Sequence, residues 1–284
     1  MPAADPISTD AVLRASVTQD AGDGAIVTLD RRFEGLPDTA HGGTVLALFD
    51  VVCATGGTRG IAAVYHRRVP LEQPLRLTRT GTGDTTRLVL SDGATPLVTG
   101  TPATAAETLP ARIEPPRAGD ALALPVSRTC FACGTDNSLG LRARLAIDEH
   151  AVGGVWEPPA PLRADDGTLA TVALTGLLDE VAFWLGAAAS GEAGMTTDLR
   201  VTLHATVAFG RRLTVAGARG AVRAQADPRY RDTEVQAHDD DGTLVASARI
   251  TFVAVRGAAR KLAAALLTLN PPDALRVIFP AYVR

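Results

Sequence analysis

The stretch TLATVALTGLLDEVAFWLG at residues 168–186 is apolar on nearly every side of a helix, yet it carries Asp179 and Glu180 in its middle. A second apolar stretch, HGGTVLALFD at residues 41–50, leads to another acid, Asp50. Burying an unpaired carboxylate is costly, or it neutralises the group. These acids must therefore be paired, hydrated or chemically active, and the two stretches indicate one structural unit written twice.

Strand-like segments surround each apolar helix in the same order. The first copy has an expected helix at 42–56, with expected strands at 13–19, 24–33, 64–81, 85–93 and 95–103. The second copy has an expected helix at 168–189, with expected strands at 141–148, 151–158, 199–220, 232–242 and 243–255. The strands alternate polar and apolar residues, as in an antiparallel sheet with one wet face. Because each lone helix is apolar almost all round, we expect a curved sheet wrapped around it.

Changes of composition divide the chain into four parts. The prediction is an N-terminal domain at 1–105, a linker at 106–128, a C-terminal domain at 129–256 and a C-terminal helix and tail at 257–284. The linker region has four prolines between 107 and 128 and no sustained period, which is typical of an extended connection. In the tail, ARKLAAALLTL at 259–269 has strong helix formers, and the Asn-Pro-Pro that follows ends the helix.

Composition narrows the classes of partner. The 284 residues are 46% hydrophobic and 21% charged, as in ordinary globular proteins, and the N-terminus has no signal-type stretch. The net charge of −3 is spread along the chain, so we expect no nucleic-acid or membrane partner. Three cysteines suit a reducing compartment. We expect a cytoplasmic, bacterial protein that needs no cofactor, takes a small-molecule substrate and can associate with copies of itself.

These segments resemble the hotdog fold, in its acyl-CoA thioesterase branch that includes the phenylacetate-pathway and 4-hydroxybenzoyl-CoA types. In that branch a His-Gly-Gly turn opens the central helix and an acid follows nine positions after the His, as His41, Gly42 and Gly43 precede Asp50. CFACGTDNSLGL at 130–141 also resembles the opening segment of many members. The resemblance implies an α+β chain of two tandem hotdog domains, paired as an intrachain pseudo-dimer.

The second copy keeps its acid but lacks the turn, with Ala170, Thr171 and Val172 in its place. The amides of a helix start can polarise a thioester carbonyl, while a carboxylate acts as base or nucleophile. From Gly42 to Asp50 a helix rises about 12 Å, too far for both to act on one carbonyl. An acid from the other helix is therefore needed, and we assign the site to the first turn with Asp179.

Other residues have weaker support. Thr175 lies one turn before Asp179 and is expected to hydrogen-bond a water or the acid, whereas Glu180 points about 100° away. Arg67 and Arg68 are candidate ligands for the phosphates of coenzyme A, and they equally suit a solvated strand edge. Arg211 and Arg212 correspond to them loosely in the second copy.

These residues can also have purely structural roles. Asp50 and Asp179 also suit interface acids that bond loop amides, and His41 also suits an anchor of its loop. Cys130 and Cys133 form a CxxC; zinc needs four ligands, and His150 or His238 would have to be recruited, so we expect no metal. Cys53 is expected in the core.

The expected reaction is hydrolysis of acyl-CoA or acyl-carrier thioesters, assisted by a carboxylate. One rival is a hydratase, a dehydratase or another biosynthetic enzyme on the same fold, although no Asp-x₄-His is present. A second rival is a non-catalytic acyl-CoA-binding protein. Fold alone does not choose among them.

Overall fold

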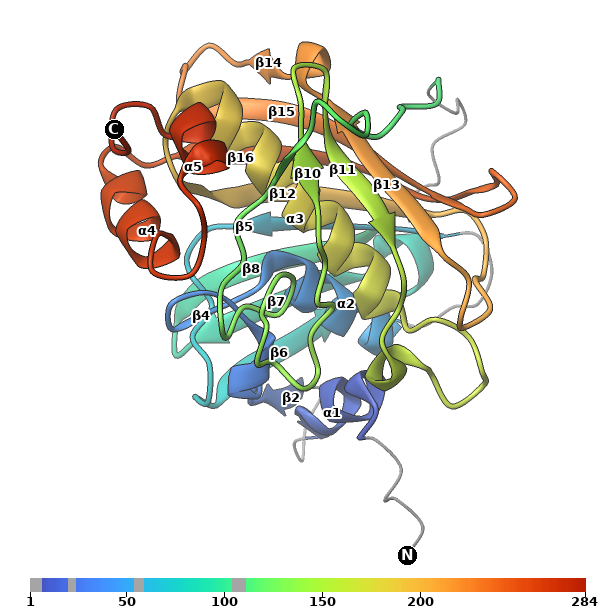
Figure 1. Cartoon of the computed structure of the whole chain (residues 1–284). Coiled ribbons are helices and arrows are strands. Elements are labelled where there is room, and N and C mark those ends of the chain that lie inside the picture. The colour runs from blue at the N-terminus through green and yellow to red at the C-terminus, as the bar shows by residue number, and fades with distance from the viewer. Residues whose placement is uncertain (1–6, 20–23, 54–58, 104–110) are drawn as a thin grey trace, which may run out of the picture.

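The computed structural model describes residues 7–19, 24–53, 59–103 and 111–284, and most of its strands join one long antiparallel sheet (Figure 1). The N-terminal half contributes β1 (Val17–Gln19), β2 (Gly24–Val27), β5 (Arg59–Tyr65), β6 (Leu75–Thr80), β7 (Arg87–Asp92) and β8 (Thr95–Ala103). The rest of the chain contributes β9 (Leu122–Ala123), β10 (Ala146–Ile147), β11 (Ala151–Trp156), β12 (Gly194–Leu203), β13 (Leu213–Ala218), β14 (Arg223–Ala224), β15 (Tyr230–Asp239) and β16 (Leu244–Ala254). A small separate sheet pairs β3 (Glu34–Leu36) with β4 (Thr39–Ala40).

The two halves meet where β5 pairs with β12. In this antiparallel pairing Asp198 lies opposite Val64 and Leu203 lies opposite Arg59. The pairing makes the sheet continuous in the order β1-β2-β6-β7-β8-β5-β12-β16-β15-β13-β11-β10-β9, with β14 added beside β15. Backbone hydrogen bonds therefore join the halves as firmly as they join neighbouring strands within each half.

Helices α2 (Gly42–Cys53) and α3 (Thr171–Ser190) lie together against this sheet (Figure 1). Helix α2 packs on β5, β8 and β12, and α3 packs on β11, β12, β13, β15 and β16. The two helices touch backbone to backbone, because a Cβ added at Gly43 would lie 2.4 Å from the carbonyl oxygen of Thr175. Glycine at 43 is required by this close approach.

Helix α3 is a core helix. Within the described ranges it alone is long and apolar enough to cross a membrane by length and composition, but 83% of that window is buried inside the protein. Its apolar side chains fill the space between the sheet and α2, as the sequence pattern indicates.

Several expected strands have different bounds. The strand predicted at 13–19 is confirmed only at residues 17–19, as β1, and is wrong at residues 13–15, which belong to the helix α1 (Thr9–Ala15). Ser8 caps this helix by accepting from the Ala11 N–H, and Asp10 pairs with Arg14 one turn later. The strands predicted at 64–81 and 199–220 are each split by a loop into β5 and β6, and into β12 and β13. Residues 54–56 of the first predicted helix lie outside the described residues.

The remaining short elements are helices and one strand. The C-terminal helix predicted at 259–269 corresponds to α4 (Ala258–Leu266), and α5 (Asp273–Ile278) follows it without having been expected. Strand β9 lies inside the predicted linker and pairs with β10, so this end of the linker belongs to the sheet. The 3-10 helices are η1 (Arg31–Phe33), η2 (Gly83–Thr85), η3 (Ala160–Leu162) and η4 (Arg219–Ala221). The domain boundaries themselves stay a prediction.

Candidate functional site

The Asp179 carboxylate lies at the N-terminal turn of α2, although it belongs to the middle of α3. Its Oδ2 accepts a hydrogen bond of 2.9 Å from the Gly43 N–H, and its Oδ1 accepts one of 2.6 Å from the Thr196 hydroxyl. Only 5% of Asp179 is exposed. The structure thus brings the acid of the second half to the glycine turn of the first, and two donors hold the carboxylate in place.

His41 lies between two acids. Its Nδ1 is 3.3 Å from Oδ2 of Asp179, and its Nε2 is 3.6 Å from Oε2 of Glu180. Burial disfavours the imidazolium, but the Glu180 and Asp179 carboxylates outweigh burial and raise the pKa of His41 to about 9. His41 therefore carries a positive charge at neutral pH, which partly balances the two buried acids.

Glu180 is held in turn by Trp184. The indole Nε1 of Trp184 donates a hydrogen bond of 2.8 Å to Oε1 of Glu180, one helical turn earlier. The ring of Phe131 packs edge-on against the other side of the site, with its centroid 6.0 Å from that of His41. Glu180, which the sequence ranked below Asp179, is thus part of the same cluster.

A cavity of about 790 Å³ opens beside these groups. Its wall includes His41, Gly42, Asp179, Glu180 and Thr196. Pockets of this size suit small-molecule ligands. The charged cluster is therefore accessible to a bound substrate and is not sealed in the core.

The first amides of α2 have different partners. The Gly43 N–H is shared between Oδ2 of Asp179, at 2.9 Å, and Nδ1 of His41, at 3.2 Å. The Gly42 N–H has no hydrogen-bond acceptor among the described residues. Gly42 also lines the cavity, and its carbonyl accepts a hydrogen bond of 2.6 Å from the Tyr65 hydroxyl. Burial raises the pKa of Tyr65 well above 10, so this hydroxyl stays a donor. Among the described residues, none accepts from the Gly42 N–H in competition with a ligand.

Asp50 has a different environment. Both of its oxygens accept from the Arg59 guanidinium, at 2.6 and 2.5 Å, and Arg59 also donates to the Thr171 hydroxyl. Asp50 therefore faces the degenerate turn of the second copy, but Arg59 lies between Asp50 and Thr171 of that turn. Asp50 does not line the cavity.

Thr175 does not have the role expected for it. Its hydroxyl is fully buried and donates to the carbonyls of Thr171 and Val172 in its own helix. Thr196 of β12 makes the expected contact with Asp179. The sequence analysis missed Thr196 because it started that strand at 199, and no motif marks this threonine.

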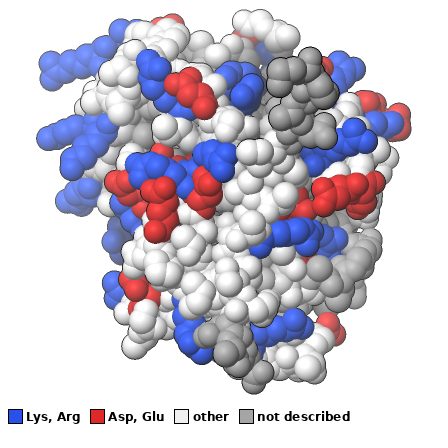
Figure 2. Space-filling view, turned by 90° about the horizontal axis from the view of Figure 1, so that it is seen from below, with Lys and Arg blue, Asp and Glu red and all other residues white. Residues whose placement is uncertain are grey.

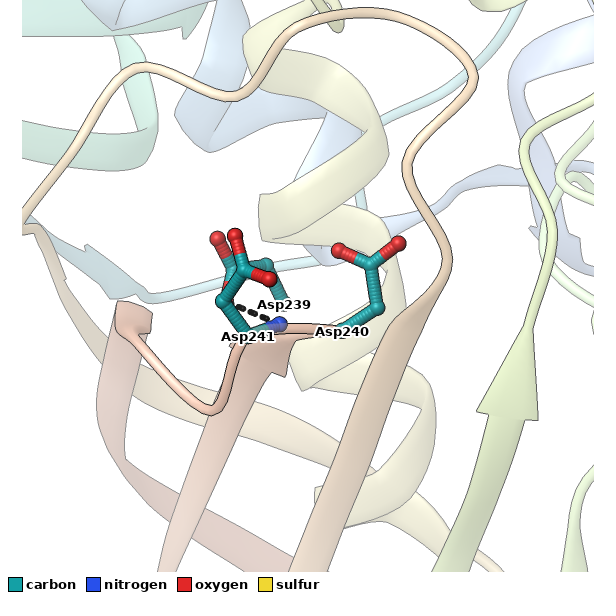
Figure 3. Close-up of side chains that lie close together, drawn as sticks. All are labelled: Asp239, Asp240 and Asp241. Carbon is teal, nitrogen blue, oxygen red and sulfur yellow. Dashed lines mark hydrogen bonds between the residues drawn. The ribbon is translucent and has the colours of Figure 1, made fainter.

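The arginine candidates separate into two groups. Arg67 and Arg68 are exposed and line the cavity, and the Arg68 Nε lies 3.3 Å from the Met195 sulfur. Arg211 instead forms ion pairs with Asp239, Asp240 and Asp241 at the turn after β15. Figure 3 shows these three carboxylates close together, at the turn that follows β15.

Groups that could ligate a metal ion were compared with the CxxC of the sequence. Within the described residues, the group of three aspartates at 239–241 is the one cluster of His, Cys, Asp or Glu close enough to share an ion, and Arg211 already neutralises it in part. Cys130 and Cys133 are free thiols that line the cavity, without His150 or His238 beside them. Cys53 is half-buried against the core.

The surface shows mixed charge. On the face drawn in Figure 2, basic and acidic side chains lie among broad uncharged areas. This distribution agrees with the net charge of −3. The expectation that neither nucleic acid nor membrane binds stays a prediction.

No protein-family model and no curated protein sequence matches the chain. Solved structures do. A conserved protein of unknown function with hot dog fold from Alicyclobacillus acidocaldarius has a TM-score of 0.59 at 11% identity, covering 86% of this chain and 98% of that one. The acyl-CoA thioesterase II TesB2 from Mycobacterium marinum has a TM-score of 0.54 at 13% identity, covering 87% and 98%.

A GphF dehydratase is also similar, with a TM-score of 0.52 at 13% identity, covering 84% of this chain and 97% of its own. Identities this low establish shape and leave activity open. The long antiparallel sheet with its two central helices, together with these likenesses, confirms the fold expected from the sequence: the chain has the α+β hotdog fold.

Proposed function

We propose that the chain hydrolyses acyl-CoA thioesters in the cavity beside α2 and α3. The observation that carries the proposal is the Asp179 carboxylate, which Gly43 and Thr196 hold at the cavity wall beside the free Gly42 N–H. Hydrolysis of a thioester requires a base that activates the attacking water and a donor that stabilises the carbonyl oxygen. A fixed carboxylate and an unpaired amide at a helix start can supply these two groups. The similar thioesterase from Mycobacterium marinum supports the same reaction class.

In the proposed mechanism Asp179 acts as general base. It takes a proton from a water molecule as the water attacks the carbonyl carbon, and the C–S bond then breaks to release the acid and the thiol. The Gly42 N–H and the charged His41 stabilise the negative charge that forms on the carbonyl oxygen. Asp179 returns its proton to the leaving sulfur, so the enzyme regains its starting state.

Coenzyme A would be held at the cavity by cations. Arg67, Arg68 and Arg128 line it and are exposed, so their guanidinium groups can pair with phosphates without a buried-charge penalty. We also propose that the chain is related to the phenylacetate-pathway and 4-hydroxybenzoyl-CoA thioesterases. The same proposal includes that it acts in the cytoplasm and associates with copies of itself.

A panel of acyl-CoA thioesters tests it, with released thiol as the readout. We expect turnover by the wild type and a loss of about a hundredfold or more in kcat for Asp179→Asn. Asp92→Asn, which changes an exposed aspartate of β7, is the matched control and should keep full activity. Absence of thiol release from every thioester, with acyl-CoA still bound, would favour the binding protein instead.

A second candidate is dehydration of a hydroxyacyl thioester. The direct contact between His41 and Asp179, from opposite halves, favours it, since an acid and a base are what that reaction needs. The contact also weakens it, because the 3.3 Å between them leaves no room for a substrate between the two groups. Incubation with 3-hydroxyacyl-CoA, read as the ultraviolet absorbance of the enoyl product, separates the two reactions.

A further inference from the structure

We propose that helix α4 forms a fixed wall of the acyl-binding part of the cavity, and that the substrates are therefore thioesters of long aliphatic acyl groups. The inference rests on the proposed function and names its substrate class. Its evidence is independent of the catalytic groups, since it depends on which side chains line the cavity beyond them.

The lining of the cavity changes character away from Asp179. Helix α4 and the turn after it contribute Leu262, Ala265, Leu266, Thr268 and Leu269, so this side is mainly apolar. The Thr268 hydroxyl donates to the Ala265 carbonyl of its own segment. The wall therefore offers a ligand mainly hydrocarbon, and covering an acyl chain there is favourable.

Other elements add apolar side chains to the lining. Phe183 and Trp184 follow Asp179 on α3, and Met195 and Val253 line the cavity from the paired strands β12 and β16. Phe183 is four residues beyond Asp179, a helical rise of about 6 Å. An acetyl group held at Asp179 is shorter than this rise and would leave the apolar end of the cavity unfilled.

The first anchor of α4 is Glu192. Its carboxylate accepts hydrogen bonds of 3.1 Å from the Gly257 N–H at the helix start and one from the Tyr282 hydroxyl near the chain end. It also accepts from the Ala259 N–H. One acid at the end of α3 therefore holds both ends of the C-terminal segment.

The second anchor is Asn270, just after α4. Its side chain accepts from the Val126 N–H at 2.7 Å and donates to the Val126 carbonyl at 2.8 Å. Phe279 adds a ring contact with Trp184, at 6.5 Å between centroids. With both ends pinned, α4 behaves as a rigid wall, and side-chain volume on it sets the room for the acyl chain.

Leu266 is the residue that tests the wall. It lines the cavity and is 5% exposed, whereas its neighbour Leu267 is 39% exposed and does not line it. Leu266→Phe should reduce kcat/KM for the longest acyl-CoA thioesters about tenfold relative to short ones, and Leu266→Ala should shift the preference toward longer chains. Leu267→Phe and Leu267→Ala are the matched controls and should keep the wild-type profile from acetyl-CoA to palmitoyl-CoA.

Binding of free fatty acids gives a readout that needs no turnover. Trp184 lies in the cavity wall and Trp156 does not, so its fluorescence should change on binding, with affinity rising with chain length in the wild type. Leu266→Phe should weaken the longest acids about tenfold, and Leu267→Phe should not.

Equal chain-length profiles for the Leu266 and Leu267 variants, in binding and in turnover, would overturn the inference. If fatty-acid binding depends on chain length and on Leu266 but no thioester releases thiol, the proposed hydrolysis is overturned, and α4 is still the acyl wall.

Discussion

Oε2 of Glu180 lies 3.6 Å from Nε2 of His41, whereas Asp179 lies beside the other ring nitrogen, Nδ1. The imidazole is therefore bracketed by acids from consecutive positions of one helix. In the proposed reaction Glu180 is therefore a positioning residue, which would act on the thioester only through the charge and orientation of His41.

Removing the Glu180 charge should lower the pKa of His41. Glu180→Gln keeps the Trp184 hydrogen bond available and removes the carboxylate that favours the imidazolium, so the pKa should fall from about 9 toward neutrality. NMR titration of the five histidines measures it. Glu149→Gln, beside the exposed His150, is the control and should leave the His41 titration unchanged. An unchanged His41 pKa in Glu180→Gln would contradict this role.

The His41 charge should also make stability depend on pH. Its pKa in the folded protein is about 9, above the value of 6.5 for an unfolded chain, so its contribution is complete below about pH 6.5 and is lost as pH rises through 9. The free energy of unfolding should therefore fall across this window by about 1 kcal/mol or more. His41→Gln should show a flatter profile in urea unfolding, and equal slopes would rule the effect out.

Thr196 should matter for turnover more than for binding. Thr196→Val removes the donor to Oδ1 of Asp179 and should lower kcat about tenfold or more with little change in KM. Thr196→Ser keeps the hydroxyl and should restore most of the activity. A serine variant as slow as the valine variant would show that packing, and not the hydrogen bond, is what matters.

The pair Asp50–Arg59 should contribute stability. Arg59→Met leaves a buried carboxylate unpaired and should lower the free energy of unfolding by about 3 kcal/mol. The double variant Asp50→Leu with Arg59→Met removes both charges and should recover much of that loss. Denaturant midpoints measure all three proteins, and an additive double variant would mean that the two charges are not coupled.

Glycine 43 should be intolerant of any side chain. Gly43→Ala places a Cβ 2.4 Å from the Thr175 carbonyl oxygen, and backbone cannot yield there, so we expect a loss of about 2–3 kcal/mol in thermal or urea unfolding. Gly220→Ala, with open space around its Cβ, is the control. If both variants unfold at the same midpoint, α2 and α3 are less tightly packed than described.

Much of the fold could be predicted because it depends on the periodicity of apolar residues along the chain. The apolar helices with their internal acids and the strand periodicity are local features of the sequence, and both helices lie within three residues of their expected starts. Helix α1 was missed because the alternating residues at 13–19 suit a strand, which forms only at 17–19. The Ser8 cap and the Asp10–Arg14 pair favour a helix over the residues before it.

The candidate site could be approached from the sequence only through distance along a helix. The rise from Gly42 to Asp50 pointed to Asp179 of the other helix, and Asp179 does accept a hydrogen bond from the Gly43 N–H. The catalytic roles of these residues stay a proposal. Thr196 and Arg59 could not be found in this way. Their roles arise from the pairing of β5 with β12, a long-range contact that no local spacing records.

That pairing of β5 with β12 also decides how the catalytic groups respond to dilution. A site assembled from two separate subunits falls apart when the protein concentration drops below the dissociation constant of the dimer. Here one polypeptide carries both contributors, with Gly43 before the seam and Asp179 after it, and continuous strand hydrogen bonds hold them together. The proposed activity per molecule should therefore stay constant on dilution.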